Sequence, residues 1–535
     1  MQQVLIDEFQ DTSPLQWHAL YGWLSAYAGA GGGASGQRPP SVFIVGDPKQ
    51  SIYRFRRAEP RVFEAARDFV VQGLHGHHLA CDHTRRNAPA VVQALNQVFG
   101  EAARDDAWTP FRPHTTASTE AGAVQALPGI ARPDKAAAAA RSGWRDSLTE
   151  PRHDDEEHLR VVEARQVAAC VRAWLDEGTL QPDRVMLLSR KREHLRRLAD
   201  ALAAVNVPFV MPEALQLADE PEAQDLVAVL DVLASPAHDL SLARALKSPL
   251  FDASDDDLLR LSLAARAAGA SWLDTLVASR PDAPWSAALQ RARRLLAGWC
   301  AAVAELTPHE LLDRVVDEGD LMQRLLARTP PSRRAVARQL VRTLLQAALE
   351  LDGGRFVSTY RFVRAVRQGQ VKSPGLVPQS AVQLLTVHGA KGLEADVVVL
   401  TDADGERPNP PRATLLVDWP VERAAPRRAA FVLSESAVPP ALQGALLDEQ
   451  TARAREDLNA LYVAVTRARQ RLVVAHTEPF RRGPRSWWDR LQPQAEPLDP
   501  AEELQAAAGA PAVVAVERLP RLGRQASASA GPAPG

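Results

Sequence analysis

The sequence predicts an α/β protein built on parallel sheets, with an all-helical part inserted between the segments that form the sheets. Two short apolar runs, residues 4–6 and 42–45, each lead into acidic residues, a pattern typical of buried strands whose carboxyl ends carry functional groups. Strand patterns return at 382–387, 397–400 and 472–475. Between them, from about 190 to 370, Leu, Ala and Arg recur at helical spacing. The chain is therefore expected to leave its sheet core and return to it.

Periodicity and composition predict the remaining elements in chain order. The helical periods favour helices at about 14–27 and 161–175, and a further buried strand is expected at 185–188. Glycine-rich and polar stretches favour flexible or exposed loops at 28–36 and 132–158.

Size, charge and cysteine content restrict the class of protein. A chain of 535 residues is long enough for roughly three structural units. Its formal net charge of -2 provides no general positive field for nucleic acid, so any DNA contact must be local. The three cysteines are far apart, which favours a reducing, cytoplasmic setting. No apolar run approaches the roughly 20 residues that a membrane helix requires, so membrane insertion and secretion are not expected.

The first chemical motif is VLIDEFQDT, which begins at Val4. Adjacent carboxylates at a strand end can divide two tasks: Asp7 would hold nucleotide-bound Mg²⁺, and Glu8 would orient and deprotonate the attacking water. A bare Asp-Glu pair is more often solvated surface. The preceding strand pattern and the Phe-Gln-Asp-Thr that follows favour the functional interpretation.

The second motif is VGDPKQSIYRFRRA, from Val45 to Ala58. It combines an amide, two aromatic residues and several arginines, a mixture with which single-strand binders stack bases and follow phosphates. Tyr53 and Phe55 could stack bases. The alternative is that both aromatic residues belong to a core and that the arginines are solvated.

Together these two motifs resemble motifs II and III of the UvrD family of superfamily 1 DNA helicases, in the form found in the RecB and AddA types. The resemblance implies that Gln50 senses the γ-phosphate of ATP and couples it to DNA. It also implies that Tyr53, Phe55 and Arg56 line a single strand.

Three later segments are similar to further motifs of that family. The run TRRNAP resembles motif IV, although Thr84 and Arg85 depart from its common form, and it implies that Arg86 reaches the γ-phosphate. The run VQLLTVHGAKGLEADVVVL, residues 382–400, resembles motif V. It implies DNA contacts for Thr386 and His388 and a nucleotide contact for Glu394. Motif VI is matched by EDLNALYVAVTRARQRLVVA, residues 456–475, and there Arg467 would be the arginine finger.

The resemblance implies RecA-like (P-loop NTPase) sheets, ATP and Mg²⁺ as cofactors, and single- or double-stranded DNA as partner. It also allows a partner helicase-nuclease subunit. The expected domains are the C-terminal part of the first motor domain (1–74), the first part of the second (75–245), an inserted helical subdomain (246–378), the second part of the second motor domain (379–491), and a disordered tail or linker (492–535).

One family feature is not found in the sequence. A phosphate-binding loop ends in Gly-Lys-Ser/Thr, but the chain contains no Gly-Lys dipeptide and motif II already starts at residue 4. We therefore expect an incomplete first motor domain with open apolar faces, most simply from a truncated helicase that acts 3′-to-5′ in recombination and break repair. The rival interpretation is a subunit that binds DNA or serves as a scaffold without enzymatic activity. Third comes a self-contained ATPase with an unusual phosphate site. No Asp-Tyr-Lys nuclease signature occurs.

Basic runs at 190–197 and 333–342 could contact DNA phosphates, but arginines at helical spacing are more often a solvated face. His75, His77 and His78 lack neighbouring ligands of metal-site type, so no zinc site is expected there.

Overall fold

The computed structural model describes residues 3–28, 41–105, 108, 110–132, 155–178, 180–211, 215–353, 357–373, 380–404, 413–481, 483 and 485–498. Most of the loops expected at 28–36 and 132–158, and most of the expected tail from 492, lie outside these residues. Some of their residues lie inside and form regular structure. Ala28 ends helix α1, and Asp155 begins helix α5. The start of the expected tail forms a short 3-10 helix (Gln492–Gln494) and strand β15 (Glu496–Pro497).

The chain divides into two compact units. The first contains Met1–Ala201 and continues from Val382, and the second contains Leu202–Ala381. The helical unit is therefore larger than the expected subdomain at 246–378. It begins earlier because helices α7 (Pro221–Ala234) and α8 (Asp239–Lys247) bury side chains such as Leu230 in the same core as the later helices. Residues 1–74 are not separated from the sheet of the first unit.

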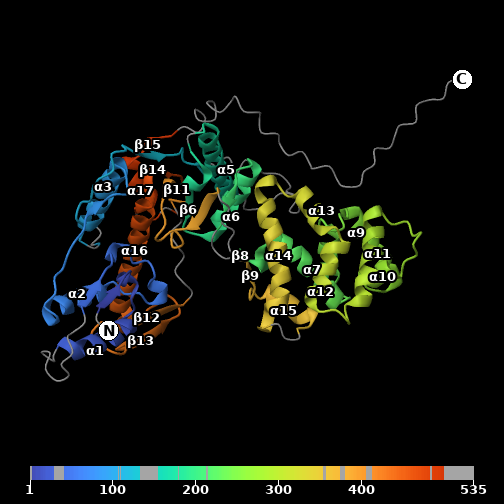
Figure 1. Ribbon diagram of the computed structural model, residues 1–535, viewed down its shortest axis with the longest axis horizontal. Coiled ribbons are helices and arrows are strands. Elements are labelled where there is room, and N and C mark those ends of the chain that lie inside the picture. Colours follow the sequence, from blue (N-terminus) through green and yellow to red (C-terminus); the bar gives the residue numbers. More distant parts are fainter. Residues whose placement is uncertain are drawn as a thin grey trace. The chain divides into compact units, whose positions relative to one another are not determined.

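The N-terminal part of the first unit is a small α/β layer. Strands β1 (Gln3–Ile6) and β2 (Ser41–Ile44) pair in parallel. Helices α1 (Pro14–Ala28) and α2 (Arg61–Gly73) lie beside them, around a core that includes Phe9 and Trp17 (Figure 1). Leu5 and Phe43 are 73% and 58% exposed, so this sheet has an open apolar face within the described residues.

The main sheet of the first unit is parallel throughout and runs in the order β15-β5-β14-β11-β6-β10. The fully buried strand β6 (Val185–Ser189) lies between β10 (Val382–Thr386) and β11 (Ala395–Leu400), so residues about 200 positions apart in the sequence are neighbours. Strand β14 (Ala468–Val474) pairs with β11, and β5 (Ala123–Ala126) lies between β14 and the edge strand β15. The α/β class and the inserted helices are confirmed.

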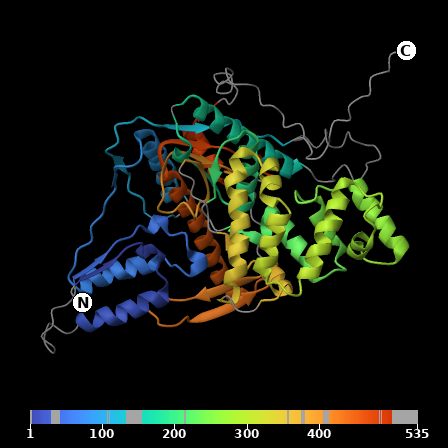
Figure 2. The same cartoon turned by 45° about the vertical axis from the view of Figure 1, so that its right-hand side comes forward.

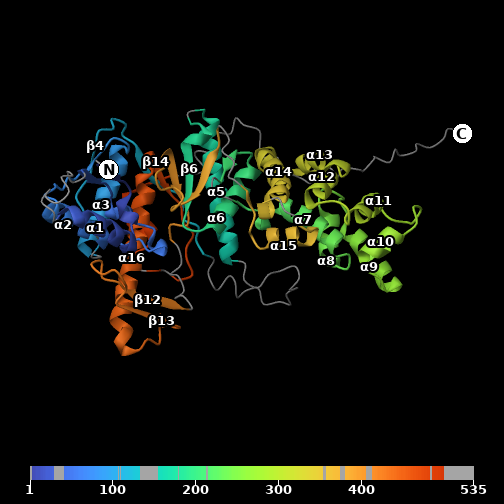
Figure 3. The ribbon, with the colours of Figure 1, turned by 60° about the horizontal axis from the view of Figure 1, so that its bottom comes forward.

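Helices cover both faces of this sheet. Helices α3 (Pro89–Asp105), α16 (Gln443–Thr466) and α17 (Trp487–Leu491) share one core with alternate residues of the strands. Helices α5 (Asp155–Asp176) and α6 (Arg192–Ala204) lie on the opposite side, as Figure 3 shows. Two short strands, β3 (His83–Thr84) and β4 (Thr115–Thr116), form a separate parallel pair.

Helix α16 extends beyond the sheet and is the longest described element of the first unit. Its first turns pack through Leu446 against Leu416 and Val432 of an antiparallel hairpin, β12 (Thr414–Asp418) and β13 (Arg428–Val432) (Figure 2). Its C-cap is Arg467. No sequence pattern predicted the hairpin.

The second unit is a helical bundle with a continuous core that includes Trp299, Leu311 and Phe362. Ser254 and Thr307 start two of its helices with capping boxes, which supply acceptors for otherwise unpaired amides. The other elements are β7 (Phe209–Val210), β8 (Leu215–Gln216), α9 (Asp255–Ala268), α10 (Trp272–Ala278), α11 (Ala287–Ala302), α12 (Pro308–Glu318), α13 (Leu321–Arg328), α14 (Arg334–Glu350), α15 (Thr359–Arg367) and β9 (Lys372–Ser373). Among the described helices of both units, none is long and apolar enough to cross a bilayer.

Candidate functional site

The acidic pair follows β1 directly and is held in an unusual conformation. Glu8 has φ 53° and ψ 37°, a left-handed backbone that residues other than glycine seldom adopt. Its amide donates to Asp7 Oδ1 at 2.8 Å, and Gln10 Nε2 donates to Glu8 Oε2 at 2.6 Å. The buried Gln10 also accepts from the Asp47 amide at 3.0 Å. One amide side chain thus ties the first motif to the second.

Close packing around Gln10 explains the glycine of the second motif. A Cβ at position 46 would lie 2.6 Å from Gln10 Oε1 and 3.0 Å from the Phe63 ring. Only glycine leaves room for the amide that holds Glu8 and Asp47.

Lys391 connects this acidic end to the second half of the unit. Its ammonium donates to Asp11 Oδ2 at 2.6 Å and lies 3.3 Å from Glu8 Oε2, and its side chain is only 6% exposed. Burial raises the pKa of Asp11, although the hydrogen bond from Lys391 opposes the rise. No role for Lys391 was predicted from the sequence, even though it lies inside the motif at 382–400.

An arginine-rich cavity of about 520 Å³ brings together four of the predicted nucleotide residues. It is lined by Gln50, Arg86, Glu394 and Arg467, among others. Arg86 forms an ion pair with Glu394, and Gln50 donates to Asp47 Oδ2 at 3.2 Å. Asp7 and Glu8 line an adjoining cavity of about 620 Å³, to which Asp47 and Gln50 also contribute.

Arg467 is buried and donates its hydrogen bonds to neutral acceptors. Its guanidinium donates to the carbonyls of Val463 and Leu393, each at 3.1 Å, and to Thr466 Oγ1 at 3.0 Å. Burial, with some repulsion from Arg86, lowers its pKa to about 10. A cation held in this way, beside a second arginine, favours an anion in the cavity.

The aromatic residues of the second motif gather beside His388. The rings of Tyr53 and Phe55 are 5.8 Å apart, and the Phe55 and His388 rings are 5.6 Å apart. Tyr53 Oη donates to the His388 carbonyl at 3.3 Å, and the Arg56 guanidinium lies 5.2 Å from the Tyr53 ring. Phe55 is 66% exposed, so the alternative that both aromatic residues belong to a core is wrong. We name Tyr53, Phe55, Arg56 and His388 the aromatic platform.

Thr386 is placed differently from the other predicted DNA residues. It ends β10, is buried, and accepts a hydrogen bond from the Gly389 amide at 3.1 Å through its hydroxyl. In this structure its side chain supports the turn that carries His388.

Two residues that the sequence did not single out fasten the second motif to α16. Asn459 donates to the carbonyls of Ser51 at 2.9 Å and Pro48 at 3.3 Å, and it accepts from Trp108 Nε1 at 2.8 Å. Arg54 binds Glu449 through both terminal nitrogens. Asn459 lies in the motif at 456–475, but neither pairing leaves a local signal because the partners are about 400 residues apart.

The weaker candidates acquire mostly structural contacts. Arg190 lies 4.8 Å from the Trp487 ring and pairs with Asp457. Arg333 lies near Glu220 and Glu222. Within the described ranges, no cluster of three or more His, Cys, Asp or Glu residues has metal-site geometry.

Comparison with known proteins supplies two domain matches. Residues 1–70 match the UvrD/REP helicase N-terminal domain, and residues 359–479 match the UvrD-like helicase C-terminal domain. The chain thus carries UvrD-like helicase N- and C-terminal domains, and the resemblance inferred from the motifs is confirmed.

Curated relatives are similar along nearly the whole chain. A protein of Listeria welshimeri, which bears the name of an ATP-dependent helicase/nuclease subunit, is 24% identical over 533 residues, which cover 93% of this chain and 41% of the relative. Proteins of the same name from Desulforudis audaxviator and Lactococcus lactis are 27% and 23% identical, covering 88% of this chain and 39% and 40% of their own lengths. The chain therefore spans about two fifths of the length of these relatives.

Proposed function

We propose that this chain is the motor region of an ATP-dependent DNA helicase of the helicase-nuclease type. We propose further that the helicase translocates 3′-to-5′ on single-stranded DNA and acts in recombination and break repair. The observation that carries the proposal is the convergence of the predicted residues. Four of them line one arginine-rich cavity, and the acidic pair lines the adjoining one. Lys391 lies between Glu8 of the acidic pair and Tyr53 of the aromatic platform.

The described residues fit a nucleoside triphosphate with its Mg²⁺ ion. Arg86 and Arg467 provide positive charge at the cavity, and the carboxylate of Asp7 is exposed at the end of β1. When bound, the Mg²⁺ nucleotide supplies a phosphoanhydride with part of its charge neutralised. Asp7 would hold the ion, and Glu8 would orient water and accept its proton. Arg86 and Arg467 would stabilise anionic charge, Gln50 would contact the γ-phosphate, and Glu394 would contact the ribose.

The platform fits a single strand better than a duplex. Phe55 and Tyr53 offer ring faces and edges on which unpaired bases can stack, and Arg56 adds a cation beside them. Stacking does not depend on base identity, because every base has a π-face. We therefore propose sequence-tolerant binding at this position, with His388 next to a phosphate.

Lys391 provides a physical connection between nucleotide hydrolysis at the acidic pair and strand binding at the aromatic platform. Its ammonium contacts Glu8 and Asp11 and lies 5.0 Å from the centroid of the Tyr53 ring. A strand that displaces Tyr53 would therefore shift the ammonium of Lys391, which lies next to Glu8.

The name of the relatives also supports a protein partner, and we propose one of the helicase-nuclease type. We further propose a cytoplasmic location, which the free thiols of Cys81, Cys170 and Cys300 favour.

A second candidate function is DNA binding or scaffolding without turnover. The exposed ring of Phe55 and the arginines of the cavity could bind DNA and an anion in the same way whether or not hydrolysis follows.

Hydrolysis of ATP by the full-length gene product separates the two candidates. We expect hydrolysis that oligo(dT) stimulates, and a loss of about 100-fold or more in Glu8→Gln, since the carboxylate acts as general base. The matched control is Glu64→Gln, an exposed glutamate on α2, which should hydrolyse ATP like the wild type. Oligo(dT) binding without any hydrolysis would favour the scaffold. Equal hydrolysis by both variants would contradict the assigned role of Glu8.

A further inference from the structure

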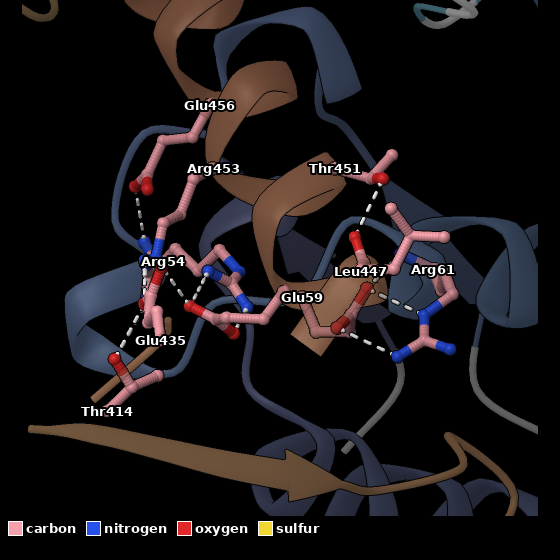
Figure 4. A network of polar contacts seen from close by, with 10 residues as sticks. Arg54, Glu59, Arg61, Thr414, Glu435, Leu447, Thr451, Arg453 and Glu456 are labelled. Carbon is pink, nitrogen blue, oxygen red and sulfur yellow. Dashed lines mark hydrogen bonds and ion pairs between the residues drawn. The ribbon is translucent and has the colours of Figure 1, made fainter. Parts of the chain in front are cut away.

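Arg54 lies between Tyr53 and Phe55 of the aromatic platform in the sequence, but its side chain packs against α16. Its neighbours Phe55 and Arg56 are exposed, whereas Arg54 is half-buried against α16. Its two terminal nitrogens donate to the two oxygens of Glu449 at 3.0 Å and 2.5 Å. Figure 4 shows Arg54 beside Arg453 and Glu456 of α16, with Glu435 and Thr414 close by.

The contact is bidentate and belongs to a longer network. Glu449 also accepts from Arg453 Nε at 2.9 Å, and Arg453 donates to Glu435 at 2.7 Å. Glu435 in turn accepts from the Thr414 hydroxyl at 2.7 Å. The hydrogen bond from Arg54 lowers the pKa of Glu449, so this pair is charged throughout the physiological range.

The backbone of the same residue is fastened to α16 as well. The Arg54 amide donates to Glu456 Oε1 at 3.1 Å, about two turns further along the helix than Glu449. Side chain and main chain therefore attach the short helix Arg54–Arg56 to α16 at two points. The same α16 ends at Arg467, about 27 Å beyond Glu449 at the rise of an α-helix.

We propose that Arg54 is a positioning residue, which fixes the aromatic platform on α16 and thereby sets its affinity for single-stranded nucleic acid without touching the strand. The inference rests on the proposed function, in which the platform stacks bases. Both terminal nitrogens of the guanidinium already bind the carboxylate of Glu449, and the side chain is half-buried against α16, so its charge is paired within the protein. A residue that contacts phosphate releases counterions on binding, and a residue that only positions others does not.

Salt dependence of binding distinguishes these two roles. The dissociation constant of this chain for fluorescein-labelled oligo(dT) would be measured by anisotropy over a range of salt concentrations. We expect Arg54→Gln to weaken binding about 10-fold at every concentration, with an unchanged slope of log K against log[salt]. Arg56→Gln should reduce the slope by about 0.7, the value for one phosphate on a single strand.

Two further variants control the comparison. Arg57→Gln removes the same charge from an exposed neighbour, and its affinity should stay within about twofold of the wild type. Glu449→Gln removes the partner instead of the arginine, and it should weaken binding about as much as Arg54→Gln does, again with an unchanged slope. A slope reduced by Arg54→Gln, or binding that Glu449→Gln leaves unchanged or strengthens, would overturn the proposal in favour of a direct phosphate contact.

Hydrogen exchange makes the proposal testable even if the chain binds no DNA. Without the Glu449 contact, the amides of residues 51–58 should exchange at least 10-fold faster in Arg54→Gln, and those of β6 should not change. If the wild type fails to bind oligo(dT), the proposed function fails, and this exchange still decides the positioning role. Unchanged exchange in 51–58 would overturn it.

Discussion

Replacing Asn459 with leucine should destabilise the first unit mainly through lost hydrogen bonds. Asn459 is 1% exposed, and leucine has the same branched arrangement of heavy atoms with somewhat larger methyl groups, so the change creates no cavity. It removes the partners of the Ser51 carbonyl and of Trp108 Nε1, which lie 2.9 Å and 2.8 Å from the Asn459 side chain. The Pro48 carbonyl, at 3.3 Å, also accepts from the Ser51 amide and loses less.

The expected cost follows from the two groups left unpaired. Each buried, unsatisfied donor or acceptor costs about 1–3 kcal/mol, so we expect the free energy of unfolding to fall by about 3 kcal/mol. The assay is urea unfolding followed by tryptophan fluorescence. Gln450→Leu, at an exposed position on the same helix, is the control and should change the free energy by less than about 0.5 kcal/mol. A loss below about 1 kcal/mol in Asn459→Leu would refute the reasoning.

Two other predictions concern the charged residues of the site. Arg467→Met should abolish ATP hydrolysis while leaving the free energy of unfolding unchanged or higher. Burial lowers the pKa of Arg467 to about 10, so holding this side chain charged in the folded protein costs about 3 kcal/mol. Methionine removes that cost, and the loss of the hydrogen bonds to Val463 and Leu393 offsets the gain only in part. Urea unfolding of the variant tests this, and a loss above about 1 kcal/mol would contradict it. Lys391→Met should lower Tm more at pH 7 than at pH 4. Without the ammonium, the already raised pKa of Asp11 rises further, so the folded state binds the proton more tightly than the unfolded state, and stability is lost as pH rises above about 3.8. An equal fall in Tm at both pH values would argue against the Lys391–Asp11 contact.

Sequence patterns located most of the sheet and most of the candidate site. Apolar runs predicted β1, β2, β6, β10, β11 and β14 to within a few residues. Parallel strands buried on both faces, such as β6 and β11, are nearly continuous apolar segments, and β1 and β2 are apolar runs although Leu5 and Phe43 are exposed. The convergence of Arg86, Glu394 and Arg467 on one cavity could be anticipated only from the order of the family motifs, since each is an ordinary charged residue by itself.

The contacts that hold the site together could not be predicted in this way. The Arg54–Glu449 pair and the Asn459–Ser51 bond join residues separated by 395 and 408 positions, and no periodicity records such pairings. The β12–β13 hairpin was missed because its outer face is apolar and exposed, with Phe431 at 71%, so its strands lack the usual alternation of buried apolar and exposed polar residues.

The earlier start of the helical unit has a similar cause. Helix α7 has the same apolar periodicity as the other helices, and only the tertiary core decides to which unit it belongs. Boundaries between packed helices depend on contacts that local sequence does not specify.

Binding of single-stranded DNA by the aromatic platform is the central claim, and equilibrium anisotropy with labelled oligo(dT) tests it most directly. Phe55 is exposed and would lose its stacking surface in Phe55→Ala. Since stacking is worth about 1–3 kcal/mol per base, we predict a dissociation constant at least about 5-fold higher than that of the wild type. Phe431→Ala, at an equally exposed phenylalanine on β13 outside the platform, should bind like the wild type. Equal affinity of the wild type and Phe55→Ala would contradict the claim.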